Sequence, residues 1–342
     1  MNDQKEMRET LLRISELIDT ALQHPQDSAG DFKLQVETPS AHLPVGCSIK
    51  SLPNRLLKKA AETAISINPV NAPVLGPMTE LAVDGVMDPQ FLTVLTGKYW
   101  GPTPRRLTVS FMESTPAELR RRIIDHMNAW SKTACISFSE AASGAGHVRI
   151  SRRPGGYWSY LGTDILFIPR DRPTMNLEGF AMDTPEEEFI RVVRHETGHT
   201  LGFPHEHMRE ELVKRIDPEK AYAYFWRTQR WDRRTVDQQV LTPLIEPSIM
   251  GTPADETSIM CYQLPGAITR DGRPITGGLD INATDYAFAG KIYPKPKGLH
   301  LPDYPQPEMV EAENPWSEAE DVQAEEISSR VKTTLFTAGL LG

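Results

Sequence analysis

The chain has 342 residues, a length that fits one large or two ordinary domains at about 150 residues each. Its 46 acidic and 37 basic residues give a formal net charge of −9, which argues against a general nucleic-acid-binding protein, because such proteins carry a basic surface. Hydrophobic residues make up 39% of the chain without any run of the roughly 18 apolar residues that a membrane span needs, so we expect no integral membrane segment.

The N-terminal part of the chain predicts helices but no catalytic chemistry. Residues 5–22 carry apolar side chains three and four positions apart, the spacing of an amphipathic helix, and a second helix is expected at 55–65. The strongly charged first 24 residues lack the apolar stretch of a secretory signal peptide, so we expect a cytoplasmic protein or one exported by a non-classical route. Residues 1–99 are interpreted as a helical and irregular N-terminal extension, either a pro-segment or an accessory region.

Residues 100–295 show the alternation of strands and helices expected of a folded domain. Thr115-Pro116-Ala117-Glu118 and Thr184-Pro185-Glu186-Glu187 both predict capped helix starts with proline at the first helical position. Strands are expected at 107–111, 136–139, 147–151 and 165–168. This order predicts an α+β domain with a mixed sheet. The Pro-rich and acidic residues 296–342 predict a solvated C-terminal tail.

Three histidines have the spacing of a metal site, and they lie in the helix predicted after Thr184-Pro185-Glu186-Glu187 and in the turn that follows it. His195 and His199 lie four positions apart, so a helix presents both rings on one face. Gly202 permits a turn that a residue with a β-carbon would resist, and Pro204 prevents the helix from continuing, so His205 can face the same ion. Three neutral imidazoles leave one position open for water, which is the arrangement of a catalytic zinc site.

Glu196, beside the first of these histidines, is the candidate general base for that water. A carboxylate in this position can accept a proton as the water attacks a carbonyl and can then protonate the departing amine. We therefore expect one catalytic Zn²⁺ and a protein or peptide substrate.

The pattern HExxHxxGxxH, from His195 to His205, resembles the zinc signature of the metzincin peptidases. Phe203 and Glu206 make it similar to the astacin family in particular. The resemblance implies a metzincin-like fold over roughly residues 105–294. That fold has a twisted mixed sheet, an active-site helix below a cleft, and a smaller C-terminal lobe after Gly202.

The resemblance extends to a second motif, Ser258-Ile-Met-Cys-Tyr262, which is similar to the astacin Met-turn. It implies that Met260 lies beneath the metal and that Tyr262 donates a hydrogen bond to the oxyanion of the reaction, where such a donor stabilises developing charge. A competing turn at 248–251 has no tyrosine two residues after Met250, so Met260 is preferred.

The resemblance also implies roles for residues around the site. A strand near Tyr157–Leu161 would lie at the edge of the sheet and pair with an extended substrate, with Trp158 and Tyr160 as candidate substrate contacts or as core residues. In astacins Glu206 pairs with a newly freed N-terminal ammonium, which here would require cleavage near residues 98–106. Otherwise it needs another cation, for which Arg209 is a candidate.

The chain departs from secreted astacins in its cysteines. Cys47, Cys135 and Cys261 are too few and too widely spaced for a disulfide framework, and Tyr157 stands where the family usually has a cysteine. Cys47 as a thiolate, or a carboxylate such as Asp31 or Asp84, could instead fill the open metal position and make the extension inhibitory. His207, just past the signature, is expected to point away from the metal.

These patterns predict a zinc-dependent endopeptidase that hydrolyses internal peptide bonds through a metal-activated water. The alternative is a non-catalytic, zinc-stabilised protein-binding module, which would share the ligands but would not need Glu196 or Tyr262. A further alternative is a peptidase restricted to one particular partner protein.

Overall fold

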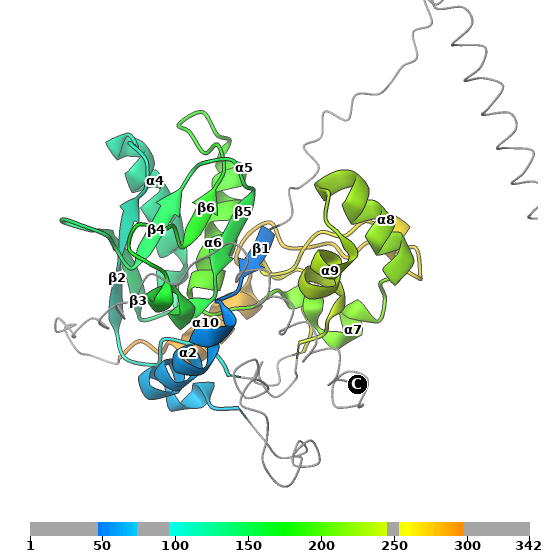
Figure 1. Ribbon diagram of the computed structural model, residues 1–342, viewed down its shortest axis with the longest axis horizontal. Coiled ribbons are helices and arrows are strands. Elements are labelled where there is room, and N and C mark those ends of the chain that lie inside the picture. The colour runs from blue at the N-terminus through cyan, green and yellow to red at the C-terminus, as the bar shows by residue number, and fades with distance from the viewer. Residues whose placement is uncertain (1–46, 74–95, 245–252, 297–342) are drawn as a thin grey trace, which may run out of the picture. The chain divides into compact units, whose positions relative to one another are not determined.

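A computed structural model describes residues 47–73, 96–244 and 253–296, all of which belong to one compact unit (Figure 1). The helix expected at 5–22, the alternative Met-turn at 248–251, Asp31 and Asp84, and the tail from residue 297 onward lie outside the described residues. Within the described ranges, no helix combines the length and the apolar character that crossing a membrane requires.

The centre of the fold is a six-stranded mixed sheet with the strand order β1-β5-β6-β4-β2-β3. The strands are β1 (Cys47–Lys50), β2 (Arg105–Phe111), β3 (Ile136–Glu140), β4 (Val148–Ser151), β5 (Tyr157–Tyr160) and β6 (Met175–Leu177). β5 and β6 are antiparallel, and all other neighbouring pairs are parallel. The predictions of strands at 107–111, 136–139 and 147–151 are confirmed, because alternating apolar residues such as Leu107 and Val109 are fully buried on one face.

The strand at Tyr157–Tyr160 forms as expected, but β1 covers the edge that we expected to be open. Cys47 pairs with Tyr157 and Lys50 with Tyr160 in a parallel register, which places β1 at the outside of the sheet (Figure 1). The prediction of an edge strand free to receive a peptide is therefore wrong for this state of the chain. Pairing between segments about 110 residues apart leaves no local signal in the sequence.

The helices around the sheet are α2 (Asn54–Ile67), α4 (Ala117–Met127) and a continuous helical segment made of α5 (Glu186–Glu188), a π-helical turn η5 (Phe189–Val193) and α6 (Arg194–Thr200). The helix expected at 55–65 is confirmed as α2. The remaining short helices around the sheet are 3-10 turns, η1 (Pro69–Asn71), η3 (Asn128–Lys132) and η4 (Gly162–Phe167).

The helices expected after Thr115 and Thr184 form, but the prediction that these threonines cap them is wrong. α4 begins at Ala117 and α5 at Glu186, and in each case the preceding proline occupies the cap position with extended backbone angles and no side-chain cap. The Thr115 hydroxyl donates to the carbonyl of Glu113 at 2.9 Å, and the Thr184 hydroxyl accepts from the N–H of Ala181 at 2.9 Å. Each threonine stabilises the preceding turn instead of the helix end.

The strand expected at 165–168 is also wrong, because this apolar segment lies in the 3-10 helix η4. Gly162 begins this helix with φ of +48°, in the left-handed region, and a Cβ there would overlap the carbonyl of Lys98. A short, fully buried apolar run does not distinguish a strand from a helical turn by periodicity.

The boundary expected between residues 99 and 100 lies inside a packed segment. Tyr99 and Trp100 are 3% and 0% exposed, and the indole N–H of Trp100 donates to the carbonyl of Thr200 at 2.8 Å. Leu52 and Ala60, on either side of the start of α2, belong to the same core cluster. Part of the N-terminal extension is therefore integral to the sheet domain.

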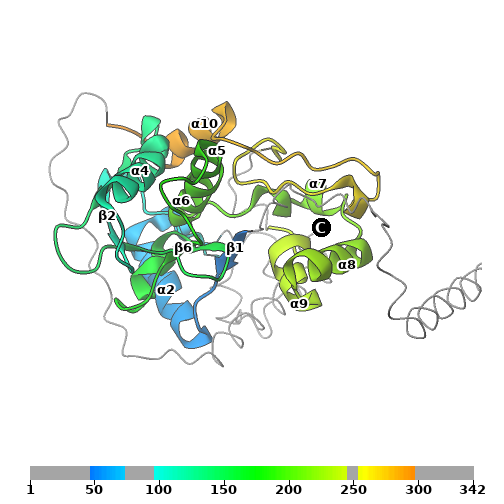
Figure 2. The ribbon, with the colours of Figure 1, turned by 90° about the horizontal axis from the view of Figure 1, so that it is seen from above.

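A second, smaller core follows Gly202, as the resemblance implied. The segment around this core, the second lobe, contains α7 (Glu210–Val213), α8 (Pro218–Gln229), α9 (Arg233–Val236), the π-helical turn η7 (Asp237–Leu241) and the 3-10 turns η6 (Glu206–Met208) and η9 (Gly266–Ile268). α8 and α9 lie side by side (Figure 1, Figure 2). Its core residues are Leu212, Ile216, Ala221, Phe225, Val236, Val240, Cys261, Leu264, Ile268 and Ile275. The last helix, α10 (Ala283–Ile292), returns to the sheet domain, where Ala289 and Ile292 join the first core.

Candidate metal centre and active-site cleft

The helix that ends in α6 carries the first two candidate ligands. Phe189 and Val193 are fully buried and anchor the preceding π turn in the core. One turn later, His195 and His199 are 7% and 0% exposed, and Glu196 between them is 0% exposed. Burying three polar side chains on one short helix costs folding free energy unless hydrogen bonds, opposite charges or a metal ion compensate them.

The chain reverses directly after α6 and brings the third histidine back. Gly202 has φ of +93°, and a Cβ there would come within 3.0 Å of the carbonyl oxygen of Lys98, so both conformation and space favour glycine. The turn places His205 against the helix, with its Nε2 3.0 Å from Nε2 of His199.

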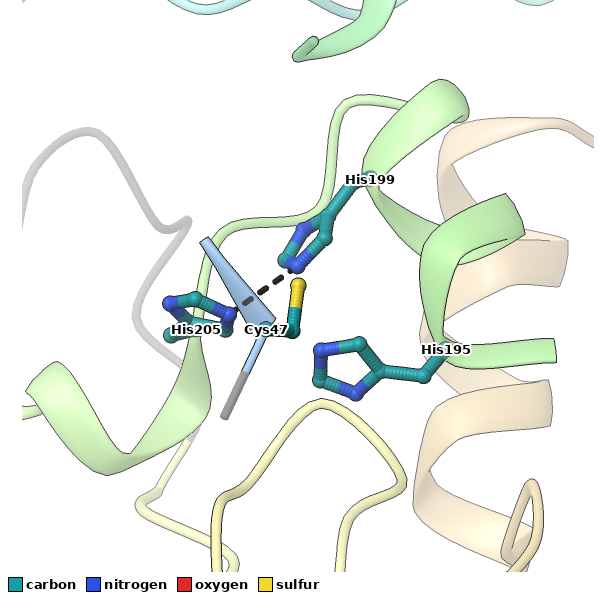
Figure 3. Close-up of side chains that lie close together, drawn as sticks. All are labelled: Cys47, His195, His199 and His205. Carbon is teal, nitrogen blue, oxygen red and sulfur yellow. Dashed lines mark hydrogen bonds between the residues drawn. The ribbon is translucent and has the colours of Figure 1, made fainter. Parts of the chain in front are cut away.

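A fourth potential ligand comes from β1. Sγ of Cys47 and one ring nitrogen each of His195, His199 and His205 all lie within 4.8 Å of one another. Figure 3 shows the thiol pointing between the three rings, with the two helical histidines on one side and His205 on the other. Sequence analysis gave Cys47 only as one of three candidates for this position, and the structure brings it together with the three histidines.

The hydrogen bonds of the helical histidines orient their rings for a metal. Nδ1 of His195 lies 2.6 Å from the carbonyl of Ile259, and Nδ1 of His199 lies 2.8 Å from the carbonyl of Phe203. A carbonyl can only accept, so each Nδ1 carries the proton and each Nε2 keeps its lone pair. Burial lowers the pKa of His195 to about 4, which keeps that ring neutral.

The residues present fit a zinc ion. The Nε2 atom of His195 is buried and has no hydrogen-bond partner within the described part of the chain. Three neutral imidazoles and one thiol form a nitrogen and sulfur donor set, which zinc prefers over calcium or magnesium. A metal ion bound among these residues would accept the lone pair of this buried nitrogen and so give it a partner.

Glu196 lies within the same buried region. Burial raises the pKa of its carboxyl group to about 8, and the positive charge of Arg191 opposes this shift. Glu196, Cys47, Arg191 and Tyr262 line one cleft, together with Tyr157, Val192, His195, Tyr224, Phe225, Gln229, Ile259, Cys261, Gln263, Leu264, Gly278 and Leu279. The carboxylate is therefore placed where a molecule in the cleft can reach it.

Met260 packs against α6, the helix that carries His195 and His199. A Cβ at Gly198 would overlap Sδ of Met260, so the thioether packs against the helix backbone between the two helical histidines. The backbone carbonyl of Met260 also accepts from the N–H of Glu206 at 2.8 Å. Met260 thus contacts both segments that carry the candidate ligands.

Asp285 is a supporting residue that sequence analysis missed. Its Oδ2 accepts from the N–H of Ile259 at 3.0 Å, and its Oδ1 accepts from the hydroxyl of Ser258 at 2.6 Å. The same residue closes the capping box of α10 with Asn282. The three-residue spacing from Asn282 to Asp285 is a local signal for the start of a helix. No local pattern indicates that Asp285 also contacts the Met-turn.

Tyr262 lies on the same side of the site as His205 and His207. Its ring stacks on His207 with centroids 4.3 Å apart and an interplanar angle of 12°, and its centroid is 4.4 Å from that of His205. Burial, with the nearby Cys47 and Glu196, raises the pKa of the phenol well above its usual value. The Tyr262 hydroxyl therefore remains a hydrogen-bond donor.

His207 is not part of the cluster of candidate ligands, although its ring lies beside that of His205, with centroids 5.0 Å apart. It is fully buried, and its Nε2 lies 2.8 Å from the carbonyl of Gln239. Burial lowers its pKa to about 3, so the ring is neutral and Nε2 carries the proton that it donates. His207 links the third candidate ligand to the π-helical turn η7.

Both predicted substrate residues, Trp158 and Tyr160, lie on the same face of β5, and neither lines the cleft. Tyr160 is buried in the first core, and the half-buried Trp158 packs beside it with ring centroids 6.0 Å apart. Tyr157, on the opposite face, lines the cleft. Alternation along a strand makes these two faces exclusive, but the sequence did not indicate which face the cleft would use.

Glu206 has the alternative cation that we considered. Nε of Arg209 lies 3.9 Å from its Oε1, and the N–H of Asp255 donates to the same oxygen at 3.1 Å. Burial nevertheless raises the pKa of Glu206 to about 7. Cys47, Cys135 and Cys261 all carry free thiols, which agrees with the expected absence of disulfides.

Comparisons with known proteins identify relatives of this chain. A family model described as Astacin, a family of peptidases, matches residues 95–271. Zinc metalloproteinase nas-27 of Caenorhabditis elegans is 32% identical over 122 residues, which cover 34% of this chain and 26% of the relative. Tolloid-like protein 1 of Mus musculus is 27% identical over 145 residues, which cover 40% of this chain and 13% of the relative.

Among solved structures, one of myroilysin matches with a TM-score of 0.54 and 31% sequence identity, covering 58% of this chain and 97% of that chain. The chain thus spans about a quarter or less of these two curated relatives, but nearly all of the myroilysin chain.

Proposed function

Because the chain belongs to the astacin family of peptidases, we propose that it is a zinc-dependent endopeptidase that hydrolyses internal bonds of proteins or peptides. The observation that carries this proposal is the convergence of three buried imidazoles, a buried carboxylate and the buried hydroxyl of Tyr262 beside a cleft that His195, Glu196 and Tyr262 line.

His195, His199 and His205 would hold one Zn²⁺. A zinc ion bound there would lower the pKa of water to about 7 and polarise a carbonyl group. The backbone carbonyls of Ile259 and Phe203 keep the two helical rings in the orientation and tautomer that this requires.

Glu196 moves the protons of the reaction. Its carboxylate accepts one proton from the attacking water, and the resulting carboxylic acid donates a proton to the amine nitrogen as the C–N bond breaks. Burial raises the pKa of Glu196, which stabilises the protonated form that donates to the amine nitrogen.

Tyr262 stabilises the oxyanion that forms on the scissile carbonyl. Its buried phenol stays protonated, and a donor aimed at developing charge is worth about 10²–10³ in turnover in comparable sites. Stacking on His207 holds the ring in place without using the hydroxyl.

Residues 1–99 contain an inhibitory pro-segment in this proposal. β1 pairs with β5, the strand expected to receive an extended substrate, and the Cys47 thiol lies among the candidate metal ligands. A thiolate would fill the fourth zinc position and exclude water. The chain must then release β1 before it can cleave a substrate.

The test compares Cys47→Ala with the double variant Cys47→Ala/Glu196→Gln, using casein as a generic substrate. We expect the first to cleave casein and to stop when a chelator removes the metal. The second should keep its zinc and lose at least about 100-fold in turnover, within the range for general acid–base catalysis. Equal activity of the two variants would overturn the mechanism, and a zinc-loaded Cys47→Ala chain that cleaves nothing would overturn the activity.

A further inference from the structure

We propose that Gln239 is a positioning residue that binds the backbone of the peptide in the cleft, on the side opposite β5, whatever the peptide's sequence. The inference rests on the proposed peptidase function and deepens it by describing how the substrate is held. It follows from how the chain's own strand β1 (Cys47–Lys50) lies in the cleft.

One edge of β1 pairs with β5, and the other edge pairs with the side chain of Gln239. The N–H of Ile49 donates to Oε1 of Gln239 at 3.1 Å, and Nε2 of Gln239 donates to the carbonyl of Ile49 at 3.3 Å. In a parallel ladder the N–H and C=O of one residue face the same edge, and those of the next residue face the other. The amide of Gln239 therefore takes the place of a neighbouring strand.

Gln239 is held in position for this role from behind. Its own carbonyl accepts from the fully buried ring of His207 at 2.8 Å, and the next residue, Val240, is 0% exposed in the second core. The backbone of Gln239 thus has a fixed relationship to the loop that carries His205, while its half-buried side chain reaches the backbone of β1. Such anchoring is what a positioning residue requires.

The contacts of Gln239 do not depend on the side chain of the residue that it binds. Both hydrogen bonds go to the backbone, so any residue except proline, which lacks the N–H, can take the place of Ile49. Rotation of the amide by 180° about χ3 exchanges its donor and acceptor, so that it can also pair with a peptide of the opposite direction. The substrate class is thus an extended peptide without proline at the bound position.

The bound position is also fixed in relation to the metal ligands. Ile49 lies two residues after Cys47, whose sulfur is among them. A substrate that replaces β1 would therefore meet Gln239 about two residues from its point of attack. We call the two backbone hydrogen bonds from Gln239 the Gln239 clamp. Loss of this clamp should weaken substrate binding and leave the chemical step intact, so KM should rise while kcat changes little.

The experiment uses the full chain with Cys47→Ala and a set of peptides in which one backbone amide at a time is replaced by an ester, which removes one N–H. Esters at positions that pair with β5 should lower kcat/KM in every variant, and we expect one further position, facing Gln239, where the ester lowers it by about 3- to 10-fold, the equivalent of one hydrogen bond. Adding Gln239→Ala should abolish this difference, while adding Gln238→Ala on the same turn should leave it.

A second measurement needs no catalysis. In the chain that keeps Cys47, Gln239→Ala should raise the hydrogen-exchange rate of the Ile49 amide by about 3- to 10-fold, and Gln238→Ala should not. An ester profile that Gln239→Ala leaves unchanged, or an Ile49 amide that exchanges at the same rate in both variants, would overturn the clamp. Failure of the Cys47→Ala chain to cleave any peptide would instead refute the peptidase function on which the substrate role rests.

Discussion

The carboxylate of Asp285 accepts a hydrogen bond from the N–H of Ile259 at 3.0 Å, and the carbonyl of that same Ile259 lies 2.6 Å from Nδ1 of His195. One backbone residue thus joins the N-terminal turn of α10 to the first candidate ligand. The Met-turn also carries Met260 and Tyr262. A displacement of this segment would therefore disturb the packing of Met260 against α6, the proposed oxyanion donor Tyr262 and the ring of His195 together.

Asp285→Asn tests this connection. The amide keeps one acceptor but presents an NH₂ group to the donors of Ser258 or Ile259, so the turn should shift and His195 should lose its fixed orientation. We expect zinc affinity to fall by about 10-fold or more, as for other residues that orient metal ligands. Competition with a chromophoric chelator measures this, with Asp271→Asn, an exposed carboxylate of the second lobe, as control. An unchanged affinity in Asp285→Asn would contradict the connection.

Gly198→Ala tests the packing of Met260 beneath the helix. Helix propensity alone would make alanine more stable by about 1 kcal/mol, but the added Cβ would overlap a buried sulfur, and overpacking costs about 1–3 kcal/mol. We therefore expect a net loss of stability of up to about 2 kcal/mol in chemical denaturation.

Two further variants separate overpacking from a general effect of alanine. Gly290→Ala in α10, where the nearest atom lies 3.4 Å from the added Cβ, should be neutral or stabilising. On a Met260→Ala background, Gly198→Ala should destabilise less, because the sulfur is gone and only the contact with Trp130, 3.2 Å from the added Cβ, remains. The same loss on both backgrounds would show that Met260 does not cause it.

Cys47→Ala tests the inhibitory contact. The substitution removes the thiol from the ligand cluster and leaves the backbone pairing of β1 in place, so β1 should open more often. A self-contact worth only about 1.4 kcal/mol would raise casein cleavage 10-fold, and we expect at least about that increase. Cys135→Ala removes a second buried thiol, far from the cluster in the sequence, and should leave activity unchanged. Equal activity of wild type and a folded, zinc-loaded Cys47→Ala chain would contradict self-inhibition.

The parts of the site that sequence analysis could predict are those set by neighbouring residues. Four-residue spacing places His195 and His199 on one helix face, and Gly202 with Pro204 indicates the turn that returns His205. The Met-turn was readable only through its resemblance to a known family, since nothing local in Ser258–Tyr262 reveals that it lies beneath α6.

The rest depends on contacts between distant segments. The pairing of Cys47 with Tyr157 and the bonds from Gln239 to Ile49 join residues about 110 and 190 positions apart, and no periodicity encodes them. The errors at Thr115 and Thr184 have another cause, because the hydroxyl of either residue can bond to the preceding turn as easily as to a helix end.

The proposed activity depends on one zinc ion held by three imidazoles at a site where Glu196 transfers the protons. Elemental analysis combined with native mass measures the metal in each chain directly. We expect one zinc per chain in wild type and in Glu196→Gln, and loss of most of that zinc in His199→Ala. A purified chain without transition metal, or one that keeps its zinc in His199→Ala, would contradict it.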